Sequence, residues 1–403
     1  MRAAIAGAGP AGAALAYLLA RRGVRVTLVE RQHDFAREFR GEGLMPSGVD
    51  ALAQMGLGAE FEALPQARIE GLDVYLNGRR QIHVDATMLP PDTALPRFVS
   101  QPALLEMLVA QAAKHPGFEL CRGAAVRELL HAGGRVTGLR IDSAGATREI
   151  AADFVVGCDG RASVVRKRAG LDRERDAQTF DVVWCKLPLP PFMRGRVRGC
   201  IGRSQFAILF EAPDGLLQLG WAIDKGAYGD IRRGGIEHWI EQLASAAPAD
   251  LAEWIRAHRG EVTHPFLLDV VCDHLDVWTA PGVLLLGDAA HPMSPVGAQG
   301  INIALRDAVI AANHLGPALA AGAGPAELDR AAESVVSERL PEVKDIQSLQ
   351  VRAPRILLQR SLAARVLMRT VVPFALRSGL AWLFASRILP IFLRGTRPVS
   401  LSF

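Results

Sequence analysis

The sequence has few of the residues that cross-link small secreted domains or hold structural metals. Its 403 residues include only five cysteines, an odd number, and these are widely spaced without a C-x-x-C pair. This distribution argues against a disulfide framework and against a structural zinc site. We therefore expect no metal centre and a cytoplasmic location, where thiols stay reduced.

An excess of charge of one sign is also absent from the chain as a whole. The 46 basic residues against 42 acidic ones give a net charge of +4, which offers no support for nucleic acid as a partner. Hydrophobic residues make up 50% of the chain and charged residues 22%, so intrinsic disorder is excluded as its main state. The length predicts two or three domains.

Glycine is abundant, and the first cluster of glycines is placed where it indicates a nucleotide site. An apolar run ends at Ala6 and Gly7-Ala8-Gly9-Pro10-Ala11-Gly12 follows, opening an apolar helix; a second run, Val24–Val29, ends on Glu30. This is G-x-G-x-x-G between a strand and a helix, with an acid about 20 residues further on.

Each part of this motif has a physical task. Gly7 permits a tight turn, Gly9 lets the backbone approach a pyrophosphate, and Gly12 allows close helix–strand packing. The helix N-terminus offers free N–H groups to phosphates. Glu30 can accept hydrogen bonds from a ribose diol and would repel a 2′-phosphate, so the pocket favours FAD or NAD over NADP.

Two further motifs follow buried strands later in the chain. The strand that includes Phe154–Gly157 runs into Cys158-Asp159-Gly160, with Ser163 as a predicted helix cap. The strand Gly282–Leu286 runs into Gly287-Asp288-Ala289-Ala290-His291-Pro292, and then through Pro295 and Gly297 into a helix from about Ile303 to Leu315. Asp288 can bind a ribityl hydroxyl, and the helix N-terminus can stabilise negative charge on a reduced flavin.

These three motifs, in this order and spacing, resemble the FAD-dependent aromatic hydroxylases (group A flavoprotein monooxygenases, similar to para-hydroxybenzoate hydroxylase). The resemblance covers roughly residues 2–315. It implies an α/β fold in which a Rossmann-like FAD-binding domain of the glutathione-reductase type is interleaved with a β-sheet substrate domain and followed by C-terminal helices. The boundaries that we predict are 1–72, 98–180 and 270–345 for the FAD-binding domain, 73–97 and 181–269 for the substrate domain, and 346–403 for a basic helical segment.

The resemblance also implies a set of cofactor-binding positions. Arg40 matches the arginine along the FAD diphosphate, Gln101 a residue on the ribityl side, and Val126 a backbone position at the adenine. The full predicted set is Gly7, Gly9, Ala11, Gly12, Glu30, Arg31, Arg40, Gln101, Val126, Asp159, Gly160, Asp288, Gly297, Gly300, Ile301 and Asn302. Pro295 and Gly297 are expected nearest the flavin C4a–N5 edge. His291 is expected to be a hydrogen-bonded structural element and not a base.

Two stretches predict the substrate sheet. Gly71–Asp85 alternates like a hairpin with Asn77-Gly78 as its turn, and 206–221 predicts a second hairpin joined through Pro213-Asp214-Gly215. Phe210, Gln218 and Trp221 are candidate pocket residues, with ordinary sheet core as the alternative. Phe210 and Ala212 stand where the best-known family member has a serine and an arginine that bind a substrate carboxylate. An apolar pocket cannot repay desolvation of a carboxylate, so a larger lipophilic aromatic is favoured.

The function that follows is that of an FAD-dependent monooxygenase. In this family NADH or NADPH reduces the FAD as a transient donor, and O2 forms a flavin C4a-hydroperoxide that hydroxylates an aromatic ring. The phenol-activating tyrosines of the family cannot be placed, because the chain has only Tyr17, Tyr75 and Tyr228.

The alternative functions are a reductase of the geranylgeranyl reductase type acting on a lipophilic substrate and a flavin-binding protein without turnover. A halogenase lacks support because W-x-W-x-I-P is missing. The sequence leaves the oligomeric state open.

The C-terminal segment leaves two interpretations open. Residues 346–403 contain nine arginines and no Asp, Glu or Lys, and between 352 and 397 the arginines alternate with apolar clusters. No apolar run approaches the roughly 18 residues of a membrane-spanning helix. The segment predicts either a peripheral membrane contact through 352–397 or helices that pack on the FAD-binding domain.

Overall fold

A parallel sheet forms the centre of one half of the molecule. The computed structural model describes residues 1–36, 42–88, 94–173, 178–202, 205–357 and 390–403. Its six-stranded sheet has the order β18-β19-β12-β1-β2-β8, and every neighbouring pair except β18–β19 is parallel. The bounds are Arg2–Ala6 (β1), Arg25–Glu30 (β2), Phe118–Arg122 (β8), Phe154–Gly157 (β12), Thr279–Ala280 (β18) and Val283–Leu285 (β19).

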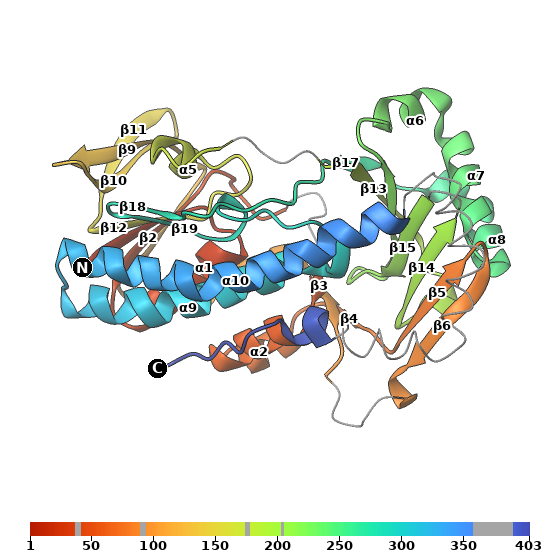
Figure 1. The fold of residues 1–403 in the computed structure, drawn as a ribbon, viewed down its shortest axis with the longest axis horizontal. Coiled ribbons are helices and arrows are strands. Elements are labelled where there is room, and N and C mark those ends of the chain that lie inside the picture. The colour runs from red at the N-terminus through yellow and green to blue at the C-terminus, as the bar shows by residue number, and fades with distance from the viewer. Residues whose placement is uncertain (37–41, 89–93, 174–177, 203–204, 358–389) are drawn as a thin grey trace.

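Helices and a small antiparallel sheet surround this parallel sheet (Figure 1). Helix α1 contacts both α4 and α9, and α9 contacts α10. The antiparallel sheet has the order β11-β10-β9. The bounds are Pro10–Arg21 (α1), Gln101–Ala112 (α4), Val164–Arg168 (α5), Gly300–Ala321 (α9), Pro325–Leu357 (α10), Ala124–Ala132 (β9), Arg135–Ser143 (β10) and Ala146–Ala151 (β11). Helix α9 is longer than predicted and includes Pro317, and it ends at Gly322, whose left-handed backbone glycine adopts readily.

A seven-stranded sheet forms the other half of the molecule. Its order is β17-β13-β16-β15-β14-β5-β6, and the two predicted hairpins are confirmed as the antiparallel pairs β5–β6 and β15–β16. The bounds are Gly71–Leu76 (β5), Arg79–Asp85 (β6), Phe180–Pro188 (β13), Arg196–Gly202 (β14), Gln205–Glu211 (β15), Leu216–Asp224 (β16) and Phe266–Leu268 (β17). Helices Tyr228–Gly234 (α6), Ile236–Ala246 (α7) and Ala249–Ala257 (α8) lie on its outer side in Figure 1.

Short elements connect the two halves. A three-stranded sheet of order β3-β7-β4 comprises Gly43–Leu44, Arg97–Val99 and Gln66–Arg68. Helices α2 (Pro46–Gln54) and α3 (Gly58–Glu62) follow β3, and single 3-10 turns lie at Ala86–Met88, Pro191–Met193, Arg259–Glu261, Gly287–Ala289 and Val296–Ala298. Helix α10 runs along the parallel half toward the seven-stranded sheet (Figure 1).

The C-terminal residues return to the parallel half. The side chain of Gln54 in α2 accepts a hydrogen bond from the Leu401 N–H at 2.7 Å, and Asn313 in α9 binds the Ser400 carbonyl at 2.8 Å. This end of the chain therefore packs on the protein, whereas residues 358–389 of the predicted basic segment lie outside the described residues. None of the described helices is long and apolar enough to cross a membrane.

Candidate functional site

The three sequence motifs meet at one edge of the parallel sheet. Strands β1, β12 and β19 are neighbours, and each motif follows the carboxyl end of one of them. A methyl group built on Gly7 would lie 2.8 Å from the Cα of Asp159, and one built on Gly287 would lie 3.4 Å from the side chain of Ala11. The carboxyl edge of a parallel sheet is where such folds bind ligands, so this edge is the candidate site.

The glycines of the first motif differ in the room around them. Gly7 has φ of +95° and a Cβ there would lie 2.4 Å from the Cys158 carbonyl oxygen; a Cβ on Gly12 would lie 2.0 Å from the Gly7 carbonyl oxygen. A Cβ on Gly9 would meet no atom within 4 Å, and the same holds for Gly160 and Gly300. Gly9, at the start of α1, therefore faces open space suited to a pyrophosphate.

Glu30 ends β2 with its carboxylate facing the first motif. It is buried, and its two oxygens accept hydrogen bonds from the Ala8 N–H at 2.9 Å and the Gln32 N–H at 3.0 Å. Arg31 beside it is exposed. The carboxylate is thus fixed next to the glycine turn, at the place where a ribose of a bound dinucleotide would lie.

The second motif shapes its turn through a helix cap. The Asp159 carboxylate accepts hydrogen bonds from the backbone N–H groups of Val164 (2.7 Å) and Val165 (3.1 Å) and from the Ser163 hydroxyl. Ser163 in turn accepts from the Arg166 N–H, as expected of a cap. Asp159 therefore caps α5, and Gly160, with φ of +79°, is the open part of the turn.

The third motif presents Asp288 partly to solvent. Its side chain is 36% exposed and receives a hydrogen bond from Arg161 Nε at 3.3 Å. The neighbouring Ala289 carbonyl accepts from the buried guanidinium of Arg166 at 2.9 Å. The turn is thus held from behind while the Asp288 carboxylate stays accessible to a ligand hydroxyl.

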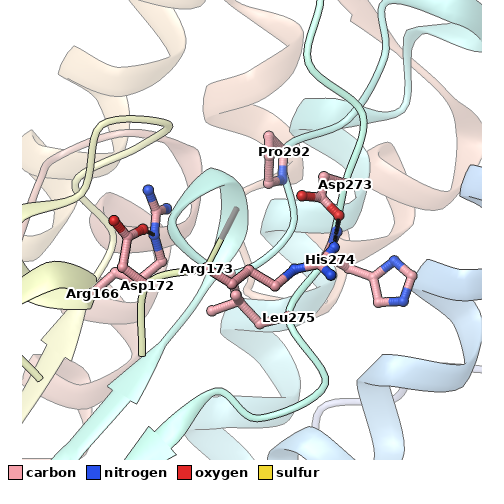
Figure 2. Close-up of a pocket in the computed structure, with 8 residues that line it drawn as sticks. Arg166, Asp172, Arg173, Asp273, His274, Leu275 and Pro292 are labelled. Carbon is pink, nitrogen blue, oxygen red and sulfur yellow. Dashed lines mark hydrogen bonds and ion pairs between the residues drawn. The ribbon is translucent and has the colours of Figure 1, made fainter. Parts of the chain in front are cut away.

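A small pocket lies behind this turn (Figure 2) and is lined by Arg166, Asp172, Arg173, Asp273, His274, Leu275, Ala290 and Pro292. Arg166 binds Asp172 at 2.8 Å, and Arg173 pairs with Asp273. Both arginines are neutralised by carboxylates. The pocket therefore supports the turn and does not offer a charged binding site.

The loop after the third motif is held by helix α10. Gln350 donates to the carbonyls of Ser294 (3.0 Å) and Val296 (2.7 Å), and Gln347 donates to the carbonyl of Pro292 (3.1 Å). From the C-terminal end of the chain, the Phe392 ring covers Gly297, since a Cβ on Gly297 would lie 2.5 Å from it. The hydrogen bonds from α10 and the Phe392 ring together fix the backbone of this loop.

The predicted cofactor residues Ile301 and Asn302 are buried in this support. Asn302 accepts from the Met45 N–H at 2.7 Å and donates to the carbonyls of Ala298 and Gly43. Its side chain therefore joins the loop at 296–298 to β3 and positions the loop. Gln101 begins α4 and Val126 lies in β9, both half-buried, while Arg40 lies outside the described residues.

His291 belongs to a buried network of charges. It contacts Asp307 at 2.7 Å, and Asp307 is also bound by Arg339 Nε at 2.8 Å; Arg339 and Arg306 both pair with Glu342. Burial acts to raise the pKa of Asp307, but His291 and Arg339 outweigh it and lower that pKa below its ordinary value. His291 is thus hydrogen-bonded inside the protein, as we expected, and its having no role as a base stays a prediction.

Sequence reasoning missed the contribution of α10. Arg339, Glu342, Ile346, Gln347 and Gln350 recur at helical spacing and face the protein interior. The sequence indicates this buried helix face only through a periodic mixture of polar and apolar residues, which apolar periodicity alone does not reveal.

The substrate-side prediction needs one correction. Phe210 and Gln218 are cross-strand partners on one face of the seven-stranded sheet, but Trp221 lies on the other face, where it packs against Trp239 of α7. Side chains alternate along a strand, so positions 218 and 221 point to opposite faces. Trp221 is core beneath the outer helices and does not line the inner face.

The residues at the sheet edge fit FAD. The open approach at Gly9, the fixed Glu30 carboxylate and the accessible Asp288 offer a pyrophosphate cradle, a ribose acceptor and a ribityl acceptor in one site. A dinucleotide with a flavin at its far end matches this order of groups.

Comparison with known proteins agrees with this fit. The model of the family described as FAD binding domain matches residues 1–347. The 6-methylpretetramide 4-monooxygenase of Streptomyces rimosus is 35% identical over 88% of this chain and 84% of its own length. The protoasukamycin 4-monooxygenase of Streptomyces nodosus subsp. asukaensis is 30% identical over 83% of each chain.

Among solved structures, PqsL of Pseudomonas aeruginosa in complex with 2-aminobenzoylacetate has a similar fold. The TM-score is 0.78 at 24% sequence identity, covering 91% of this chain and 99% of PqsL. The fold class predicted from the three motifs is confirmed. The chain belongs to the FAD binding domain family and is a flavin-dependent monooxygenase, an oxidoreductase whose cofactor is FAD.

Proposed function

We propose that this protein uses NADH or NADPH and O2 to hydroxylate a lipophilic aromatic small molecule. The observation that carries the proposal is the aromatic inner face of the seven-stranded sheet. There the rings of Phe98 and Phe210 stack with centroids 3.7 Å apart, and Trp184 meets Phe210 edge-on at 6.2 Å. Val296 of the loop at 296–298 packs against the same cluster, so the cluster adjoins the proposed flavin edge.

The charge pattern of the sheet supports a substrate without a carboxylate at this face. The arginines of β14 belong to the other face, where Arg198 binds Asp250 at 2.9 Å and Arg196 binds Asp73 at 2.9 Å. Lys186, on the inner face, is paired with Asp214 at 2.5 Å. Phe210 and Ala212, which the family resemblance matches to carboxylate-binding positions, are both buried and apolar. An aromatic ring can replace the stacked contacts, whereas a carboxylate would lose its hydration without a partner.

When bound, FAD accepts a hydride from the nicotinamide and activates O2 for transfer of one oxygen atom to the ring. The protein residues supply position and a dry environment. Phe98, Phe210 and Trp184 hold the ring and exclude water, and the loop through Pro295 and Gly297 sets the approach to the flavin. We also propose the boundaries predicted above for the FAD-binding domain, the substrate domain and the C-terminal segment.

Oxygen labelling tests the proposed function. The FAD-loaded protein is incubated with NADH or NADPH, labelled O2 and hydroxylated polycyclic aromatics, and the products are analysed by mass spectrometry. We expect one labelled oxygen atom in the product. Consumption of the nicotinamide with reduction of the organic compound and without label would instead establish a reductase.

Two matched variants show whether the inner face binds the substrate. Phe210→Leu removes the ring stack with Phe98 and is expected to raise the fraction of NAD(P)H oxidised without product, because a looser pocket admits water. Trp221→Phe, on the opposite face, is expected to keep the wild-type ratio of product to NAD(P)H oxidised. Equal ratios in the two variants would contradict the assignment of the inner face.

Peripheral membrane contact through residues 352–397 is a separate proposal, supported by the nine arginines of the C-terminal segment. Vesicles with anionic lipid are expected to sediment the protein at low salt and to release it at high salt, because salt screens the attraction. Absence of sedimentation at low salt would remove this contact. The packing of residues 395–402 on α2, α9 and α10 favours the other interpretation for the end of the segment.

A further inference from the structure

Two buried oxygen atoms in the described structure have no hydrogen-bond partner and lie beside the aromatic cluster. They are Oε2 of Glu42 and Oε1 of Gln218. The amide nitrogen of Gln218 donates to the Cys185 carbonyl at 3.3 Å, which leaves its oxygen as the free group. Burying an acceptor without a donor is unfavourable, so two such atoms in one region indicate that a ligand completes them.

The backbone at Glu42 and Gly43 contacts both the strand that carries Phe98 and the loop at 296–298. Its carbonyl accepts from the Val99 N–H at 2.8 Å, and the next residue, Gly43, is paired with Phe98. A Cβ on Gly43 would lie 2.6 Å from the side chain of Ala298. Glu42 thus joins the strand that carries Phe98 at the point where this strand touches the loop at 296–298.

Gln218 approaches the same cluster from the sheet. It is cross-strand partner to Phe210 on one side and to Lys186 on the other, and only 1% of it is exposed. Lys186, the other cross-strand partner of Gln218, also acts on the Glu42 carboxyl, so the two free acceptors belong to one region beside the stacked rings of Phe98 and Phe210. An aromatic ring that enters this cluster therefore has two free acceptors nearby.

The Gln218 oxygen is an acceptor, and so is the Glu42 oxygen when its carboxyl is ionised; this determines what can bind them. A hydroxyl group donates a hydrogen bond and satisfies either atom, whereas a carboxylate or an ether offers no proton. We propose that Glu42 and Gln218 select an aromatic substrate by accepting a hydrogen bond from its ring hydroxyl. This inference rests on the proposed function and names the residues that recognise a ring hydroxyl of its substrate.

The charges around Glu42 add a dependence on pH. Burial raises the pKa of Glu42 to about 7; Lys186 of β13 acts to lower it, and Asp214 in the turn between β15 and β16 acts to raise it. Lys186 binds Asp214 at 2.5 Å, so its charge is largely taken up by that partner. Glu42 accepts most strongly as a carboxylate, so affinity for a phenol is expected to rise as the pH rises through about 7.

A pair of probes that differ in one proton tests the proposal. 2-Naphthol and 2-methoxynaphthalene are titrated into the oxidised, FAD-loaded protein without NAD(P)H, and binding is followed by the flavin spectrum. We expect the wild-type protein to prefer 2-naphthol by roughly tenfold to a hundredfold, because hydrogen bonds to charged groups contribute in this range. Glu42→Gln is expected to lose most of this preference while keeping its affinity for the methoxy probe, and Gln218→Leu to lose part of it.

Glu333→Gln, a matched change on the exposed face of α10, is expected to bind both probes as the wild type does. The effect of Glu42 on the stability of the fold is measured separately, by the melting temperature. The raised pKa means that the folded protein loses stability as the pH rises above 4.5, the ordinary value, and through about 7. Glu42→Gln should therefore melt higher than the wild type at alkaline pH and close to it at acid pH.

An unchanged preference in Glu42→Gln, or failure of the wild type to distinguish the two probes, would overturn the proposal. This binding test uses no reductant, so its result is independent of the oxygen-labelling test. Labelled product with an unchanged preference in Glu42→Gln would leave the proposed function standing and reject the role of Glu42. A clear preference without labelled product would reject the oxygenase function alone.

Discussion

A Gly9→Ala variant is expected to fold as the wild type does and to lose most of its affinity for FAD. The added methyl group meets no protein atom within 4 Å, so the fold itself has room for it. It projects into the space where the pyrophosphate approaches the start of α1, and the close contact between backbone and phosphate is lost. We expect the dissociation constant of FAD to rise at least about tenfold, which is ~1.4 kcal/mol.

Gly12→Ala provides the contrast to this variant. A Cβ there would lie 2.0 Å from the Gly7 carbonyl oxygen, so α1 must move away from the turn. Such overpacking costs about 1–3 kcal/mol, and the apoprotein itself should melt at a lower temperature. Measurement of the apoprotein melting temperature and of FAD affinity in both variants checks the pair. Equal melting losses in the two variants would contradict the distinct roles of Gly9 and Gly12.

Arg339→Met is expected to be the most destabilising single change that the structure suggests. Arg339 is fully buried and binds the carboxylates of Asp307 and Glu342, so its removal leaves two buried acids with fewer partners. Breaking a buried ion pair from one side typically costs about 3–5 kcal/mol. Because Asp307 also accepts from the Gly287 N–H at 3.3 Å, the third motif should lose order as well.

Arg330→Met serves as the control, since Arg330 is exposed on the same helix and its loss should change stability by less than about 0.5 kcal/mol. Chemical denaturation of both variants measures the difference. Burial opposes ionisation of Asp307 and Glu342, yet the neighbouring cations lower both pKa values. Their contribution is therefore present above the ordinary values of 3.8 and 4.5 and is lost as the pH falls through the lower folded values. Similar free energies of unfolding for Arg339→Met and the wild type would contradict this role.

Much of the parallel half could be predicted because its signals are local. Gly7, Gly9 and Gly12 stand next to the strand and the helix that they connect, and Asp288 follows directly on β19. A strand followed by a glycine turn and a helix has few alternative structures. The hairpin at Asn77-Gly78 was predictable for the same reason, since this dipeptide strongly favours a tight turn.

The contacts made across the chain could not be predicted in this way. Gln350 binds the Ser294 carbonyl, and the Glu42 carbonyl accepts from Val99 next to Phe98, over separations that no local pattern encodes. Trp221 is a different case: of the two interpretations open for it, pocket residue or ordinary sheet core, the structure shows sheet core. Because side chains alternate along a strand, the odd spacing between positions 218 and 221 is itself enough to place the two residues on opposite faces.

Reaction of the reduced flavoprotein with O2 tests the central claim most directly. The purified protein is reduced without air, mixed rapidly with oxygenated buffer containing a phenolic aromatic, and followed by absorbance. A flavin monooxygenase is predicted to show a transient spectrum that belongs neither to reduced nor to oxidised flavin. Slow, direct reoxidation without such a transient, in the presence of candidate aromatics, would contradict the account, as would a protein that takes up no FAD.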